Sequence, residues 1–178
     1  IMSSDWSSDV CSSDLERAAG DGLIPDAGLD RLVLALSLSP ELCRLMLLAL
    51  RPRHALVLYT KDTERFRDGI ENSAAAIGEH GNGRSSAGTR LDFLDTSAVE
   101  EERCLRDCER WLTAASDHAA RAVDVTGGNK IMSLLLSTVA RATGTRVLYL
   151  EHDYRYGKPQ YGTERIRSLD WVGAGVDC

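Results

Sequence analysis

Apolar residues gather in short runs along most of this chain. Residues 31–37 read RLVLALS and residues 54–60 read HALVLYT, and both runs have the length of buried strands. Three more runs of this kind are RLDFLDT, AVDVT and TRVLYLE, at residues 90–96, 122–126 and 145–151. The pattern therefore predicts five strands.

Longer segments with helical features separate these runs. In residues 38–52, Ser39 can cap a helix, Pro40 suits the first helical position, and Glu41 favours the positive end of the helix. The next predicted helix, residues 61–80, has Asp62 or Thr63 as its expected cap. Two more helices are predicted, one in residues 97–118 and one that opens after residue 126.

The alternation of strands and helices indicates the fold class. Strands joined by helices of ten to twenty residues form right-handed crossovers, which give a mostly parallel sheet with helices on both faces. We therefore predict an α/β, Rossmann-like three-layer domain over residues 16–178. Residues 151–171 are polar and aromatic with Gly157 and Pro159 near their centre, and they predict a C-terminal hairpin that leaves the sheet.

The first fifteen residues differ from the rest of the chain. They repeat Ser-Ser-Asp three times and show neither helical nor strand periodicity. Residues 5–15 resemble one reading frame of a synthetic sequencing adapter, and a chain that starts with Ile1 suggests translation from a cut sequence end. We expect residues 1–15 to lie outside the fold, and a natural disordered Ser/Asp tail is the alternative. If residues 1–15 derive from an adapter, we expect the other end of the sequence to be cut as well.

Charge and composition narrow the function classes. Without the three aspartates of residues 1–15, the chain keeps 24 acidic against 21 basic residues, a net charge of −3. This mild acidity disfavours direct binding of duplex DNA, which usually needs a basic face. The chain contains no run of eighteen apolar residues, so no membrane span is predicted. The five cysteines form no CxxC pair and no secretory signal is present, so we expect reduced thiols in the cytoplasm.

The stretch DVTGGNKIMSL, residues 124–134, carries the most specific chemistry. Glycine at 127 and 128 lets the backbone approach a ligand and lets successive N–H groups point into one concavity. Lys130 falls in the first turn of the following helix, where the positive helix end makes a cation unfavourable. A cation at that place favours an anionic guest, and a phosphate or phosphodiester fits best.

Other interpretations of this stretch stay open. Gly-Gly after a strand is often a tight turn, and lysine is often a solvated surface residue. The stretch is neither GxxxxGK[ST] nor GxGxxG, so neither ATP hydrolysis nor a dinucleotide cofactor is favoured, and we expect no cofactor. Cys104 and Cys108 lie one helical turn apart, but no further Cys or His lies nearby in sequence to complete a metal site, and we predict none.

The motif also carries a family resemblance. DVTGGNKIMSLLL is similar to the D-x-T-G-G-T-K-x-M signature of CRISPR-associated Rossmann fold (CARF) domains, with Asn129 in place of the usual threonine. RLVLALSLSPE with HALVLYT looks like the first strand, ligand loop and second strand of that family, and KPQYGTERI resembles the segment after its fifth strand. Together the similarity spans about residues 32–166.

The resemblance implies a homodimer that binds a cyclic oligoadenylate second messenger around its two-fold axis, in the antiviral defence of type III CRISPR systems. It also implies that two loops and the end of the second strand form the ligand site: Ser37, Leu38, Ser39, Thr60, Lys61, Thr126, Gly127, Gly128, Asn129 and Lys130. Some CARF domains cleave their ligand without a metal, by attack of the ribose 2′-hydroxyl on the neighbouring phosphorus. Lys130 and Ser37 are the candidate catalytic residues for that reaction. The resemblance further implies an effector domain beyond residue 178 if that end is cut. Three functions therefore stay open: a sensor domain, a standalone ring nuclease, and a Rossmann-like domain for an unrelated nucleotide.

Overall fold

A computed structural model of the chain describes residues 29–79, 88–97, 99–114, 119–151, 153–155, 158–159 and 163–169. The predictions for residues 1–15, and for the Gly157 turn, lie outside the described residues. The elements follow one another in the order β1 (Arg31–Ala35), α2 (Pro40–Leu50), β2 (His54–Tyr59), η1 (Glu64–Phe66), α3 (Arg67–Glu79), β3 (Arg90–Asp95), α4 (Glu101–Thr113), β4 (Arg121–Asp124), α5 (Lys130–Thr143), β5 (Arg146–Glu151), β6 (Tyr154–Arg155), β7 (Lys158–Pro159) and β8 (Arg165–Leu169).

The main sheet has six strands in the order β3-β2-β1-β4-β5-β8. The first five are parallel and β8 runs antiparallel to β5. This arrangement confirms the predicted mostly parallel sheet. The strand order reverses between β1 and β4, so the loops after these two strands leave the sheet in opposite directions, which is the topological switch point of such folds.

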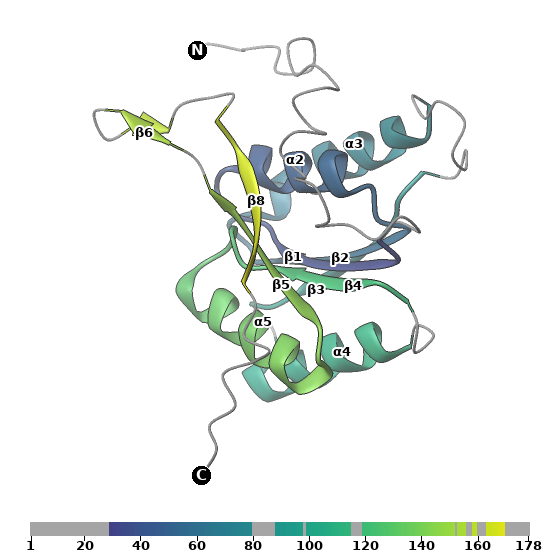
Figure 1. Ribbon diagram of the computed structural model, residues 1–178. Coiled ribbons are helices and arrows are strands. Elements are labelled where there is room, and N and C mark those ends of the chain that lie inside the picture. The colour runs from purple at the N-terminus through teal and green to yellow at the C-terminus, as the bar shows by residue number, and fades with distance from the viewer. Residues whose placement is uncertain are drawn as a thin grey trace.

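Helices cover both faces of the sheet, as Figure 1 shows: α2 and α3 lie on one face, and α4 and α5 lie on the other. The alternation of side chains along β1 supplies both layers. Leu32 and Leu34 pack into the core beneath α2 and α3, whereas Val33 and Ala35 pack into the core beneath α4 and α5. Buried strands in such a three-layer fold are apolar on both faces, which is why they appear as continuous apolar runs in the sequence.

Helix starts differ from the sequence predictions in two places. Ser39 is the N-cap residue of α2 and Pro40 occupies its first turn, but the Ser39 side chain makes no capping hydrogen bond. The segment after Thr63 begins as a single 3₁₀ turn, and α3 starts at Arg67. The Thr63 hydroxyl accepts the N–H of Thr60 in the preceding turn, so neither Asp62 nor Thr63 caps α3.

The inner face of α4 packs into the core on its side of the sheet. Leu112 is fully buried and Trp111 packs at the edge of the same core. Cys104 and Cys108 are free, buried thiols on that inner face. Within the described ranges no group of three or more His, Cys, Asp or Glu side chains lies close enough to hold a metal ion.

The chain after β5 forms the predicted hairpin. β5 and β8 are its long arms, and β6 and β7 form a separate two-stranded ribbon between them, which projects beyond the sheet in Figure 1. The second arm returns to the sheet edge, where Ile166 is buried opposite Leu150. No helix in the described part of the chain is long and apolar enough to cross a membrane.

Candidate anion site at the switch point

Two loops meet where β1 and β4 end. These strands are neighbours in register, with Leu34 opposite Asp124, so residues 36–39 and residues 125–129 emerge side by side at the carboxyl edge of the sheet. The helix that follows each loop starts at this edge, α2 on one face and α5 on the other. Their positive ends therefore converge on the region between the loops.

Packing within the protein explains why residues 127 and 128 are glycines. A Cβ on Gly127 would lie 2.2 Å from the carbonyl oxygen of Ala35 and 3.9 Å from the Ser37 Cβ, so the second loop rests directly on the end of β1. Gly128 has φ +79°, and a Cβ there would lie 2.7 Å from the Ala35 Cβ. Close packing of the two loops thus requires both glycines, before any ligand approaches them.

Asn129 is the N-cap residue of α5. Its backbone is extended, and its side-chain oxygen accepts the N–H of Met132 at 2.9 Å. Asparagine and threonine both perform this role, so the substitution of the threonine in the CARF signature keeps the cap. The side-chain oxygen of Asn129 is therefore engaged in holding the helix start.

The loop presents a run of unused donors. Over the part of the chain that the structure describes, the N–H groups of five successive residues, 127 to 131, have no hydrogen-bond acceptor. The first fixed helical bond of α5 is made by Ser133, to the Asn129 carbonyl. A row of free N–H groups at a helix start attracts an anion, because the donors and the helix dipole act in the same direction.

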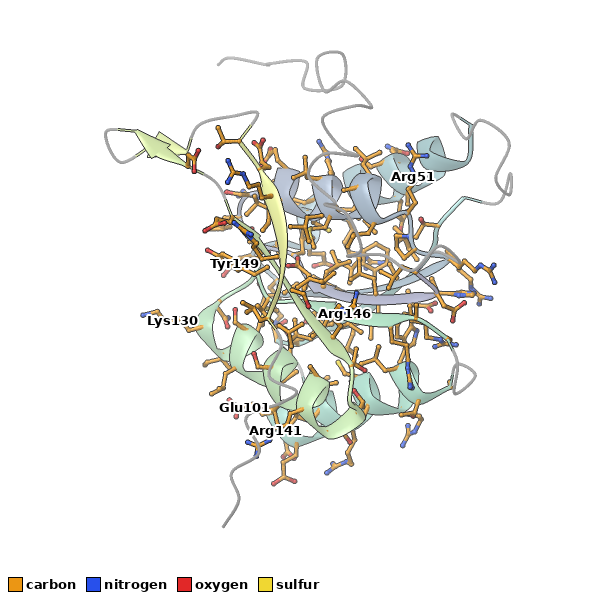
Figure 2. The ribbon with its side chains drawn as sticks, viewed as in Figure 1. Arg51, Glu101, Lys130, Arg141, Arg146 and Tyr149 are labelled. Carbon is orange, nitrogen blue, oxygen red and sulfur yellow. The ribbon has the colours of Figure 1, made fainter. Side chains whose placement is uncertain are left out.

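Lys130 adds a full positive charge to this row. It is exposed at the first position of α5, and Figure 2 shows its side chain extending from the helix start away from the body of the protein. Arg141 lies at the opposite end of the same helix, where a cation favours the helix dipole. Arg141 therefore stabilises α5, whereas Lys130 lies at the end of the helix where the dipole disfavours a cation.

The first loop contributes polar and apolar groups. The Ser37 hydroxyl donates to the Ser39 carbonyl and accepts the Ser39 N–H, both at 3.1 Å, so these two serines form one local turn. Leu38 between them is 67% exposed. The structure therefore places Ser37 of the first loop beside Gly127 of the second.

Thr60 and Lys61 lie at the end of β2, on the far side of β1 from β4. Both the N–H and the carbonyl of Thr60 bond to Thr63 within a tight turn. Asp95 at the end of β3 has a pKa below its usual range because Ser97 donates hydrogen bonds to it, and the charge of Lys61 lowers that pKa further. Thr60 and Lys61 follow β2, which β1 separates from β4 and its glycine loop.

Asp124 is the residue whose role at the site the sequence did not reveal. Its carboxyl is 1% exposed, and it accepts the N–H of Thr126 at 2.9 Å and the Thr126 hydroxyl. Burial raises the pKa of Asp124 to about 6, against the opposing effect of the Thr126 bonds. An acidic residue inside the otherwise apolar run AVDVT was the signal available in the sequence.

Comparisons with known proteins agree with this architecture. Neither a protein-family profile nor a curated protein sequence matches the chain. Among solved structures, the chain is similar to Csm6 of Enterococcus italicus bound to cyclic hexa-2′-fluoro-hexa-dAMP, with a TM-score of 0.53 and 11% identity over 73% of this chain and 35% of that one. It is also similar to Can2 from Sulfobacillus thermosulfidooxidans in complex with cyclic tetra-adenylate, with a TM-score of 0.49 and 19% identity over 74% of this chain and 36% of that one.

The likeness to Csm6 shows a shared fold. The chain spans about a third of the length of either solved structure. The comparison therefore supports the Rossmann-like architecture.

Proposed function

We propose that this chain is a cyclic oligoadenylate-binding sensor domain of type III CRISPR antiviral defence, acting in the cytoplasm. The observation that carries the proposal is the row of five unused N–H groups at residues 127–131, joined by the exposed Lys130. Such a row binds phosphate through several hydrogen bonds at once, and the ammonium group strengthens them.

Two independent lines support the ligand class. The motif DVTGGNK resembles the CARF signature, and the Csm6 structure, which shares the fold, is bound to a cyclic hexanucleotide analogue. A ring of repeated phosphodiesters fits a site with repeated anion-binding loops. The proposed ligand contacts are the backbone of residues 127–130, the Lys130 ammonium group and the first loop with Ser37, Leu38 and Ser39, while Thr60 and Lys61 are peripheral candidates.

Repetition of the loop requires a second subunit, and we include a homodimer in the proposal. Three large apolar side chains beside the site are strongly exposed: Leu38 by 67%, Ile131 by 58% and Leu134 by 70%. Ile131 and Leu134 are three residues apart and thus share one face of α5. An exposed apolar cluster next to an anion site fits an interface between two copies around a two-fold axis.

The experiment is a calorimetric titration of the protein with cyclic tetra-adenylate and cyclic hexa-adenylate. We expect Lys130→Ala to lose about 1.5 to 3 kcal/mol of binding free energy, the range for a hydrogen bond to a charged group. Arg141→Ala is the matched control, because it removes an exposed cation from the other end of the same helix. The control variant should bind like the wild type.

Three results would count against the proposal. The wild type could bind neither ring, or Lys130→Ala could bind at full strength. The third result is that Lys130→Ala and Arg141→Ala weaken binding to the same extent. In the first case a linear nucleotide that raises the melting temperature would instead support a Rossmann-like domain for an unrelated nucleotide.

Cleavage of the ring is the second candidate function. The Ser37 Cβ lies 3.9 Å from the position of a Gly127 Cβ, so a serine hydroxyl adjoins the anion loop that ends in Lys130. In this step the ribose 2′-oxygen loses its proton and bonds to the adjacent phosphorus, while the bond from phosphorus to the 5′-oxygen of the next nucleotide breaks. The 5′-oxygen takes up a proton, so the products are a 2′,3′-cyclic phosphate and a 5′-hydroxyl. Ser37 would orient the ribose or phosphate for this in-line attack, and Lys130 would stabilise the developing charge. Incubation with labelled cyclic tetra-adenylate in EDTA tests this activity. A ring that stays intact for hours under confirmed binding rules it out.

A further inference from the structure

Asp124 and Thr126 form a hydrogen-bonded link beneath the anion loop. The last residue of β4, Asp124, points its carboxylate at Thr126, where one oxygen accepts both the N–H and the hydroxyl of that residue. The Thr126 hydroxyl in turn accepts the N–H of Leu150 on β5, at 2.6 Å. A single side chain thus joins the end of β4, the start of the loop and the adjacent strand.

This link leaves Thr126 without a donor for a ligand. Its N–H and its hydroxyl hydrogen are both directed at Asp124, and a hydroxyl oxygen that accepts the Leu150 N–H has little capacity left. The residues that follow are in the opposite situation, since the N–H groups of residues 127–131 are unused within the described chain. Donors that hold the loop and donors that are left unused are therefore separated at Gly127.

The link costs folding free energy, because it buries a carboxyl group. The Asp124 carboxyl is buried, and the titratable group identified facing it from α2 is the buried Cys43. Burial raises the pKa of the Cys43 thiol, and the charge of Asp124 raises it further, so this neighbour offers no compensating charge. An ionised carboxylate in such surroundings is expensive, and a residue kept only for packing there would be apolar.

We propose that Asp124 and Thr126 are positioning residues of the ligand site, which hold the unused N–H groups of residues 127–131 in a fixed row and do not themselves contact the ligand. This inference rests on the proposed binding of a cyclic oligoadenylate. Fixed donors matter for such a ligand, because several hydrogen bonds to one phosphate form together only when the donors are already aligned.

The test compares Thr126→Val with Thr126→Ser. Valine keeps the shape of the side chain and removes the hydroxyl, whereas serine keeps the hydroxyl. We expect Thr126→Val to weaken binding of cyclic tetra- or hexa-adenylate by about tenfold or more, and Thr126→Ser by no more than about threefold. At Asp124, the asparagine variant keeps the acceptor oxygen and should bind better than the alanine variant.

Amide hydrogen exchange on the ligand-free protein supplies a readout that needs no ligand. In Thr126→Val the Leu150 amide should exchange faster than in the wild type, and in Thr126→Ser it should stay protected. Faster exchange with unchanged ligand affinity would overturn the inference, and so would equal loss of affinity in the serine and valine variants. A wild type that binds no ring contradicts the proposed function instead, and the exchange comparison then decides alone whether the link holds the loop.

Discussion

At the scale of single residues, the position of the anion loop depends on the missing side chain of Gly127. Gly127 has an ordinary backbone conformation, since its φ is not positive, yet a Cβ there would meet the backbone of β1. A backbone carbonyl cannot rotate away as a flexible side chain does. The loop would have to move outward, and the row of N–H groups would move with it.

Gly127→Ala should therefore both destabilise the protein and abolish ligand binding. Forced overpacking typically costs about 1 to 3 kcal/mol of folding free energy. Gly144→Ala is the matched control: φ there is +60°, but a Cβ would meet nothing within 4 Å. The control should lose about 1 kcal/mol from backbone strain alone and keep its affinity. Urea unfolding and calorimetry measure both effects, and a Gly127→Ala variant that binds normally would contradict the packing argument.

Asp124 should leave a signature in the pH dependence of stability. Its pKa is raised from 3.8 to about 6 by burial, so between these values the folded state binds more protons than the unfolded state. The free energy of unfolding then falls as pH rises from about 4 to above 6, by roughly 3 kcal/mol for a shift of this size. Asp124→Asn removes the titrating group and keeps an acceptor for Thr126.

We expect the difference between the two proteins to isolate this group, because all other titrating residues are common to both. Relative to wild type, Asp124→Asn should gain stability as pH rises from 4 to 7. Urea unfolding at several pH values measures it. Stability curves that run parallel over this range would show that the carboxylate is not buried at a cost.

At the scale of elements, the start of α5 depends on the hydrogen bond between Asn129 and Met132. Asn129 caps the helix through Met132, and Asn129→Ala should cost about 1 kcal/mol of stability. Asn129→Thr introduces the threonine of the CARF signature and keeps a capping oxygen, so it should lose much less stability than Asn129→Ala. Thermal unfolding of the two variants makes the comparison, and equal losses would show that the cap contributes nothing.

The elements themselves were largely predictable, and the reason lies in their burial. Strands such as β2 are apolar along their whole length because helices cover both faces, so their positions follow from the sequence alone. The cap at Asn129 was not predicted, because this residue stood out only as a departure from the threonine of the CARF signature. The role of Ala35 was not readable, because its contact with Gly128 requires knowing that β1 and β4 are neighbours. The start of α3 was missed because Thr63 bonds backward to Thr60.

At the scale of the whole molecule, the ligand site as proposed is half of a larger one. The described part of one chain offers one row of unused N–H groups and one Lys130, while a cyclic oligoadenylate repeats its phosphates around a ring. A second copy related by a two-fold axis would supply the matching half. The exposed side chains of Ile131 and Leu134, next to that row on α5, are where we expect the two copies to meet.

Leu134→Lys tests this assembly without disturbing the helix, because leucine and lysine have similar helix propensities. In the proposed dimer it exchanges apolar contact for two like charges near the axis, so we expect a monomer by light scattering and a melting temperature that no longer depends on protein concentration. A monomer offers the ring one loop, and affinity should fall by about a hundredfold or more. Ala75→Lys is the control, since it adds the same charge to an exposed position of α3 on the opposite face. A Leu134→Lys protein that stays dimeric places the interface elsewhere, whereas one that is monomeric yet binds the ring at full strength would show that a single loop is a complete site.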